Sequence, residues 1–180
     1  SYAYDNLDKN FVNYEEGIYI GYRFYETFYE GQEEAYQKAV QYPYGYGLSY
    51  TDFEWDIVST DFNEKTISMD VEVTNTGKVE GKDVVQLYYS APYYPGEIEK
   101  ASIEFGAYQK TKSLKPGEKE VVTLTYNTND MASYDMNTEQ AFVLDKGSYD
   151  IKLGQNVHDI LETKTYENKD KIIIKEDDTT

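Results

Sequence analysis

The sequence predicts a mainly β protein: an antiparallel β-sandwich preceded by a short mixed α/β segment. Two observations predict the sandwich. From Ser49 onward apolar side chains alternate with polar ones, and turn residues interrupt this alternation at intervals of about ten residues. A third observation predicts the preceding segment, because an apolar run between glycines and a stretch of helix formers come before a cluster of proline and glycine.

The composition supports a folded core and excludes several kinds of site. Hydrophobic residues make up 39% of the 180, and 21 Tyr and 7 Phe add large apolar side chains. The net charge of −17 argues against nucleic acid and anionic membranes as partners. The chain has no cysteine, which excludes disulfides, thiolate metal sites and a cysteine nucleophile.

The segment before the sandwich divides into two expected elements. Residues 17–22 form an apolar run, which predicts a strand that continues into residues 23–25. Residues 31–41 are helix formers throughout and predict a short helix. The proline and glycines of residues 43–47 end it. Residues 18–20 are an aggregation risk if they are left exposed.

The sandwich is expected to contain about seven strands. The turns include residues 114–118, where proline and glycine suit a tight reversal, and Lys146-Gly147, which predicts a hairpin between its two flanking strands. Residues 129–139 are polar and predict a loop between the two sheets. The predicted strands are 66–73, 83–90, 120–126, the two halves of 141–154, 161–166 and 171–175.

Five stretches carry a resemblance to a known family. They are EEGIYIGYRFYE (15–26), YPYGYGLSYTDFEW (42–55), VEVTNTGKVEGKDVVQLYYSAP (71–92), LKPGEKEVVTLTY (114–126) and KGSYDIKLG (146–154). In this order and spacing they resemble glycoside hydrolase family 3, from the end of its α/β sandwich domain through its fibronectin type III-like domain. The resemblance covers roughly residues 14–160. It implies an immunoglobulin/fibronectin type III-like antiparallel β-sandwich.

The resemblance also implies a division of the chain and a parent protein. Residues 1–48 would be the tail of the preceding α/β domain with a linker, 49–175 the sandwich, and 176–180 an acidic tail or linker. The parent would be a bacterial, exo-acting, retaining β-glucosidase or β-xylosidase, which uses two carboxylates. Neither catalytic motif of the family occurs in these 180 residues. We therefore assign no catalytic residue, no cofactor and no metal ligand, and we expect the chain to be a fragment of a larger enzyme.

The tyrosine-rich stretch 40–56 allows two interpretations. Its rings could stack on sugars as a ligand platform, or fill the seam of a hinge in which Gly45 and Gly47 permit close backbone approach. The change of period at this point, and the domain junction that the resemblance implies, favour the hinge. For a carbohydrate-binding role, the alternative function, the best exposed candidates are Tyr93 and Tyr94, in a turn after a strand.

The remaining candidate residues are expected to have structural roles. Asp52, Glu54 and Asp56 fall on one face of a strand and are expected to be solvated. The only histidine, His158, has polar neighbours and is expected in an exposed turn. Arg23 lies among aromatic residues and is expected to be buried or stacked and paired with a carboxylate. The sequence has no EF-hand-type calcium loop and no G-x-S-x-G motif.

The function that these observations predict is a non-catalytic accessory domain that stabilises a family 3 glycosidase. Its expected partners are the catalytic domains of the same chain. Carbohydrate is the alternative partner, and residues 1–48 could allow self-association. The compartment stays open between extracellular, cell-surface and cytoplasmic.

Overall fold

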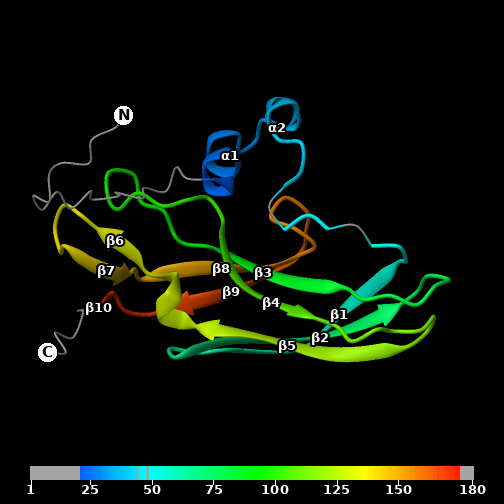
Figure 1. Ribbon diagram of the computed structural model, residues 1–180. Coiled ribbons are helices and arrows are strands. Elements are labelled where there is room, and N and C mark those ends of the chain that lie inside the picture. Colours follow the sequence, from blue (N-terminus) through cyan, green and yellow to red (C-terminus); the bar gives the residue numbers. More distant parts are fainter. Residues whose placement is uncertain (1–20, 44, 48, 175–180) are drawn as a thin grey trace, which may run out of the picture.

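The computed structural model describes residues 21–43, 45–47 and 49–174, which form a β-sandwich with two short helices lying over one side (Figure 1). The helices are α1 (Tyr22–Phe28), α2 (Glu33–Ala39) and the 3₁₀ turn η1 (Thr128–Met131). The strands are β1 (Phe53–Phe62), β2 (Thr66–Asn75), β3 (Val84–Ser90), β4 (Glu104–Lys110), β5 (Lys119–Asn127), β6 (Ser133–Asp135), β7 (Ala141–Leu144), β8 (Gly147–Gly154), β9 (Ile160–Asn168) and β10 (Ile172–Ile174).

The first sheet has the antiparallel order β1-β2-β5, with β2 in the centre. Alternate side chains of β2, from Ile67 to Val73, are at most 1% exposed, while those between them face outward. This is the alternation predicted for residues 66–73, and it arises because successive side chains of a strand point to opposite faces.

The second sheet has the order β4-β3-β8-β9, and its inner face packs on the first sheet. Tyr149, Ile151 and Leu153 of β8 are at most 2% exposed and meet the apolar face of β2 and β5 in one continuous core. The core therefore consists of interdigitated aliphatic and tyrosine side chains from two sheets, as expected for a sandwich without a disulfide. The antiparallel pairing of strands within two packed sheets confirms the predicted antiparallel β-sandwich.

A third, small sheet of order β10-β7-β6 corrects two expectations. The predicted hairpin around Lys146-Gly147 is wrong, because β7 pairs with β6 and β10 whereas β8 pairs with β3 and β9. The glycine is the first residue of β8, and it does not decide which strand each arm joins. The loop predicted for residues 129–139 is also wrong in part, since η1 and β6 lie there and β6 supplies the partner of β7.

Strand β3 is buried on both faces, which departs from simple alternation. Val85 and Leu87 face the main core, but Gln86 and Tyr88 are also buried, at 5% and 0% exposure. Tyr88 belongs to a second cluster with Ile103 and Val157, against which Tyr22 of α1 packs. The outer face of β3 is thus covered by the helices and loops that precede and follow it.

The helix α2 confirms the helix predicted within residues 31–41. The strand expected to run through residues 23–25 is wrong there, because Tyr22–Phe28 is helical, while residues 17–20 lie outside the described residues. The helix aligns aromatic rings four residues apart: Phe24 stacks on Phe28, with centroids 5.3 Å apart. A run of aromatic residues is compatible with a strand and with a helix. The sequence pattern therefore did not predict these ring pairs four residues apart.

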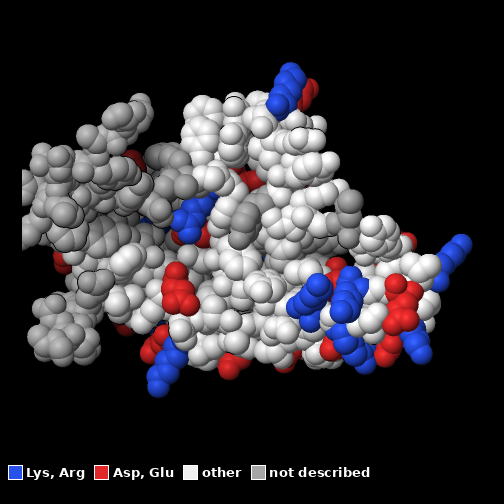
Figure 2. All heavy atoms as spheres, viewed as in Figure 1, with Lys and Arg blue, Asp and Glu red and all other residues white. Residues whose placement is uncertain are grey.

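Charge is mixed on the surface that Figure 2 shows. Basic side chains gather at the end of the sandwich where the β2–β3 and β4–β5 loops meet, and acidic ones lie among them. Exposed ion pairs form there, with Lys112 at 3.1 Å from Glu118 and Lys119 at 2.6 Å from Glu72. Within the described residues, no helix is long and apolar enough to cross a membrane.

Candidate functional site: the junction between the helices and the sandwich

Helix α1 is fastened to β4 and to the loop before it by its side chains. The Tyr22 hydroxyl accepts the N–H of Phe105 at 2.9 Å, and the Thr27 hydroxyl oxygen accepts the N–H of Ser102 at 3.0 Å. Arg23 lies 3.1 Å from the carboxylate of Glu104. The expected ion pair of Arg23 is therefore present, but its predicted burial is wrong, because the side chain is 42% exposed.

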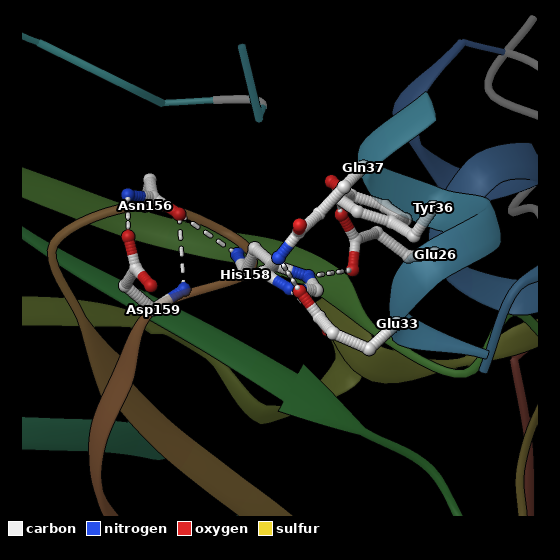
Figure 3. Close-up of polar contacts among 7 residues, drawn as sticks. All are labelled: Glu26, Glu33, Tyr36, Gln37, Asn156, His158 and Asp159. Atoms are coloured by element: carbon white, nitrogen blue, oxygen red, sulfur yellow. Dashed lines mark hydrogen bonds and ion pairs between the residues drawn. The ribbon is translucent and has the colours of Figure 1, made fainter. Parts of the chain in front are cut away.

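The loop between β8 and β9 presents His158 to both helices (Figure 3). Asn156, 3% exposed, shapes this loop: its side-chain oxygen accepts the N–H of His158 and of Asp159, both at 2.9 Å. Its amide nitrogen donates to the Asp159 carboxylate at 2.7 Å. Asparagine commonly fixes such turns through bonds to the backbone two and three residues on, so the ring of His158 projects from a rigid support.

The His158 ring lies between two carboxylates and on an aromatic face (Figure 3). Its Nδ1 is 3.4 Å from Glu26 of α1, and its Nε2 is 3.1 Å from Glu33 of α2. The ring stacks on Tyr36 with centroids 4.1 Å apart and planes 7° apart. We name these four side chains the His158 cluster.

The cluster is completed by bonds among the helical residues. The Tyr36 hydroxyl donates to Glu26, and Gln37 donates to Glu33 at 2.6 Å. Burial, reinforced by the bond to Glu26, raises the pKa of Tyr36. The pKa of His158 is also raised: burial opposes its charge, but the bonds and charges of Glu26 and Glu33 outweigh that effect.

The expectation of an exposed turn at His158 is correct for the turn and wrong for the exposure. The side chain is only 29% exposed and has partners on two helices. Those partners are 125 and 132 positions away in the chain, so no local signal in the sequence could have found them.

The chain between the helices and the sandwich is anchored at Gly45. Its carbonyl accepts a hydrogen bond from Gln86 at 2.9 Å, and the same amide nitrogen donates to Gln155 at 2.9 Å. Gly45 has φ +83°, and a Cβ there would lie 2.2 Å from Gln86 and 2.5 Å from the Tyr88 hydroxyl. The close approach expected of both glycines holds for Gly45 but not for Gly47, where a Cβ would meet nothing.

The rings of the tyrosine-rich stretch lie mostly in solvent. Tyr42 and Tyr46 contact each other with centroids 5.1 Å apart and are 63% and 46% exposed. Tyr50 is 93% exposed, and Tyr44 lies outside the described residues. The structure therefore fixes the backbone of this stretch at Gly45, while Tyr42, Tyr46 and Tyr50 stay exposed.

Tyr93 and Tyr94 lie in the loop between β3 and β4, and they are 58% and 43% exposed. The Tyr94 hydroxyl donates to the carbonyl of Lys146 at 3.0 Å. A buried ion pair holds the same loop: Lys100 lies 2.5 Å from Asp145, and its ammonium also donates to the Pro92 carbonyl at 2.6 Å. Neither tyrosine makes a contact with the His158 cluster in the interactions described.

The other candidate carboxylates are solvated or already engaged. Asp52, Glu54 and Asp56 are exposed, as expected. Among residues 21–43, 45–47 and 49–174, no three histidine or acidic side chains are placed to hold a metal ion. The adjacent acidic residues at 15–16 and 177–178 lie outside the described residues. The contacts at this junction attach the helical segment to the sandwich.

Comparison with known proteins gives similarity over nearly the whole chain. Residues 83–157 match the family of fibronectin type III-like domains. β-Glucosidase A of Butyrivibrio fibrisolvens is 40% identical over 188 residues, which is 94% of this chain and 22% of that protein. The β-glucosidase of Kluyveromyces marxianus is 35% identical over 86% of this chain and 17% of its own length.

Solved structures give the same result. β-Glucosidase 3B of Thermotoga neapolitana, in complex with α-D-glucose, has a TM-score of 0.76 and 36% identity, over 91% of this chain and 21% of that one. A β-glucosidase of Paenibacillus barengoltzii has a TM-score of 0.78 and 37% identity, over 90% and 18%. The chain thus spans about a fifth of the length of the relatives it matches.

Proposed function

Because the chain belongs to glycoside hydrolase family 3, where it corresponds to the C-terminal part of β-glucosidases and includes their fibronectin type III-like domain, we propose that it is a non-catalytic accessory domain that braces the catalytic domains of its parent enzyme. The relatives are larger multidomain chains. The brace would act by burying apolar surface of the neighbouring domains and by fixing their relative placement.

The observation that carries this proposal is the way the segment before the sandwich is attached. Residues 22–43 and Gly45 are held at three separate places: β4 with its preceding loop, the β8–β9 loop and the outer face of β3. A flexible tether would need none of these contacts. Three attachment points of this kind would fix the position of the sandwich relative to the domain that precedes it in the parent chain.

The proposal includes a division of the chain. Residues 1–48 are the tail of an α/β sandwich domain with a linker, 49–175 the fibronectin type III-like sandwich, and 176–180 an acidic tail or linker. The parent is a bacterial, exo-acting, retaining β-glucosidase or β-xylosidase of carbohydrate metabolism. The relatives compared above are β-glucosidases, which supports the first of these two activities.

Substituting the two glycines of the linker in the parent enzyme tests the brace. A Cβ at Gly45 collides with Gln86 and the backbone there has a positive φ, whereas a Cβ at Gly47 meets open space. Gly45→Ala should therefore lower the temperature at which aryl β-glucosidase activity is lost, and Gly47→Ala should leave it unchanged. If the Gly45→Ala enzyme loses its activity at the same temperature as the wild type, the attachment of the sandwich does not support the catalytic domains.

A second candidate function is binding of carbohydrate by Tyr93 and Tyr94. The observation in its favour is that both rings are well exposed, at 58% and 43%, on a loop held by the buried Lys100–Asp145 pair. Aromatic rings on a rigid support suit the apolar face of a sugar. Isothermal titration with soluble glucans and xylans tests it: binding that Tyr93→Ala and Tyr94→Ala abolish would support this role, and the absence of heat would remove it.

A further inference from the structure

The two carboxylates that face the His158 ring favour its protonated form. A carboxylate only accepts hydrogen bonds, and a neutral imidazole has one N–H and one lone pair. Here each ring nitrogen faces a carboxylate oxygen, Nδ1 at 3.4 Å from Glu26 and Nε2 at 3.1 Å from Glu33. Only the imidazolium donates to both. In the neutral ring, one of the two nitrogens would turn its lone pair toward a negative oxygen.

Helix α2 depends on this ring more than α1 does. Helix α1 has further bonds to the sandwich, through Tyr22, Arg23 and Thr27. The contacts described between α2 and the sandwich are the Glu33–His158 pair and the stacking of Tyr36 on the same ring. Both involve His158, so the attachment of α2 is concentrated on one titratable side chain.

We propose that His158 is a pH-sensitive clasp, which fastens helix α2 to the sandwich when the ring is protonated and loosens it when the ring loses its proton. The helix is 7 residues long, too short to persist in water without tertiary contacts. Loosening the clasp therefore frees residues 33–39 of the segment that leads into the sandwich.

The groups around the ring determine the direction of the effect. From α1 the ring faces Glu26, and from α2 it faces Glu33 and Tyr36; within its own loop, Asp159 is turned to Asn156. Because the pKa of His158 is raised above its ordinary value, the clasp contributes its full stability below about pH 6.5. This contribution disappears as the pH rises through the raised pKa.

The titration of His158 tests the clasp directly, since it is the only histidine in the chain and its ring signals are unambiguous by NMR. Glu33→Gln removes one of the two facing charges and should move the titration midpoint down by about one pH unit. Glu34→Gln removes the same charge one residue away on an exposed position and should leave the midpoint in place. Equal midpoints in the two variants would overturn the proposal.

Hydrogen exchange of the α2 amides tests the release. After correction for the intrinsic pH dependence of exchange, protection of residues 36–40 in the 180-residue chain should fall about 3- to 10-fold between pH 5.5 and 8.5. His158→Gln should give low protection at both values. Wild-type protection that is the same at pH 5.5 and 8.5 would refute the clasp, and so would a His158→Gln chain that keeps the low-pH protection of the wild type.

Discussion

Replacing the buried Lys100 by methionine should destabilise the chain strongly. Its side chain is 3% exposed and that of Asp145 9%, with the ammonium 2.5 Å from the carboxylate. Lys100→Met keeps the length of the side chain but leaves the Asp145 carboxylate buried without the charge that stabilises it. Breaking a buried pair in this way costs about 3–5 kcal/mol. That is a large part of the roughly 5–15 kcal/mol that holds a domain together.

The assay is urea unfolding followed by the fluorescence of Trp55, the only tryptophan, which packs on the core and donates to Asp83 at 2.6 Å. In thermal unfolding the same loss corresponds to a fall in Tm of about 10 °C. The matched control is Lys112→Met, which removes an equal charge from a pair whose side chains are 57% and 37% exposed. That change should cost no more than about 1 kcal/mol.

The double variant Lys100→Met with Asp145→Leu makes the reasoning refutable. Replacing both charges by apolar groups leaves no buried charge, so the double variant should be more stable than Lys100→Met alone. If Lys100→Met and Lys112→Met cost the same, or if the double variant is the least stable of all, an unpaired buried charge is not what destabilises Lys100→Met.

Three further predictions concern the sandwich. Asn75→Ala removes bonds to the carbonyls of Val79 and Leu114, both 2.8 Å and made by a fully buried side chain, and should cost about 1–3 kcal/mol in urea unfolding; an unchanged midpoint would contradict this. Gly106→Ala places a Cβ 2.7 Å from the buried ring of Tyr126 and should destabilise the fold by about 1–3 kcal/mol through overpacking, which lowers Tm, while Gly47→Ala meets no atom and serves as the control. Burial raises the pKa of Tyr89, Tyr126 and Tyr149, so the stability that these phenols contribute is present below about pH 10 and is lost as the pH rises further. Absorbance at 295 nm should show exposed tyrosines ionising first and these three only with unfolding, and a single phase complete before unfolding would be the contrary result.

Much of the sandwich was predictable because its strands keep a strict two-residue period. In β2 every second side chain, from Ile67 to Val73, enters the core, and in β5 Val122, Leu124 and Tyr126 do the same. The pattern succeeds where one face meets the core and the other meets water. The pattern identifies the strands and the faces they bury, but it does not identify which strands pair. For this reason Lys146-Gly147 was predicted to close a hairpin, whereas β7 pairs with β6 and β8 pairs with β3.

The junction was much harder to predict. Residues 23–25 read as the continuation of a strand, yet they lie in α1, where aromatic rings four positions apart stack. Gly45 was identified from its neighbours as a site of close approach, and its contact with Gln86 bears this out. The His158 cluster joins side chains more than a hundred positions apart, so only the folded chain brings it together.

The most direct test of the central claim is calorimetry of the parent enzyme beside a variant that lacks residues 49–175. If the sandwich braces the catalytic domains, the variant should unfold at a lower temperature and lose activity on heating sooner than the intact enzyme, and the isolated 180-residue chain should turn over no aryl β-glucoside. Identical melting and identical activity with and without the sandwich would contradict the account, and so would sugar cleavage by the isolated chain.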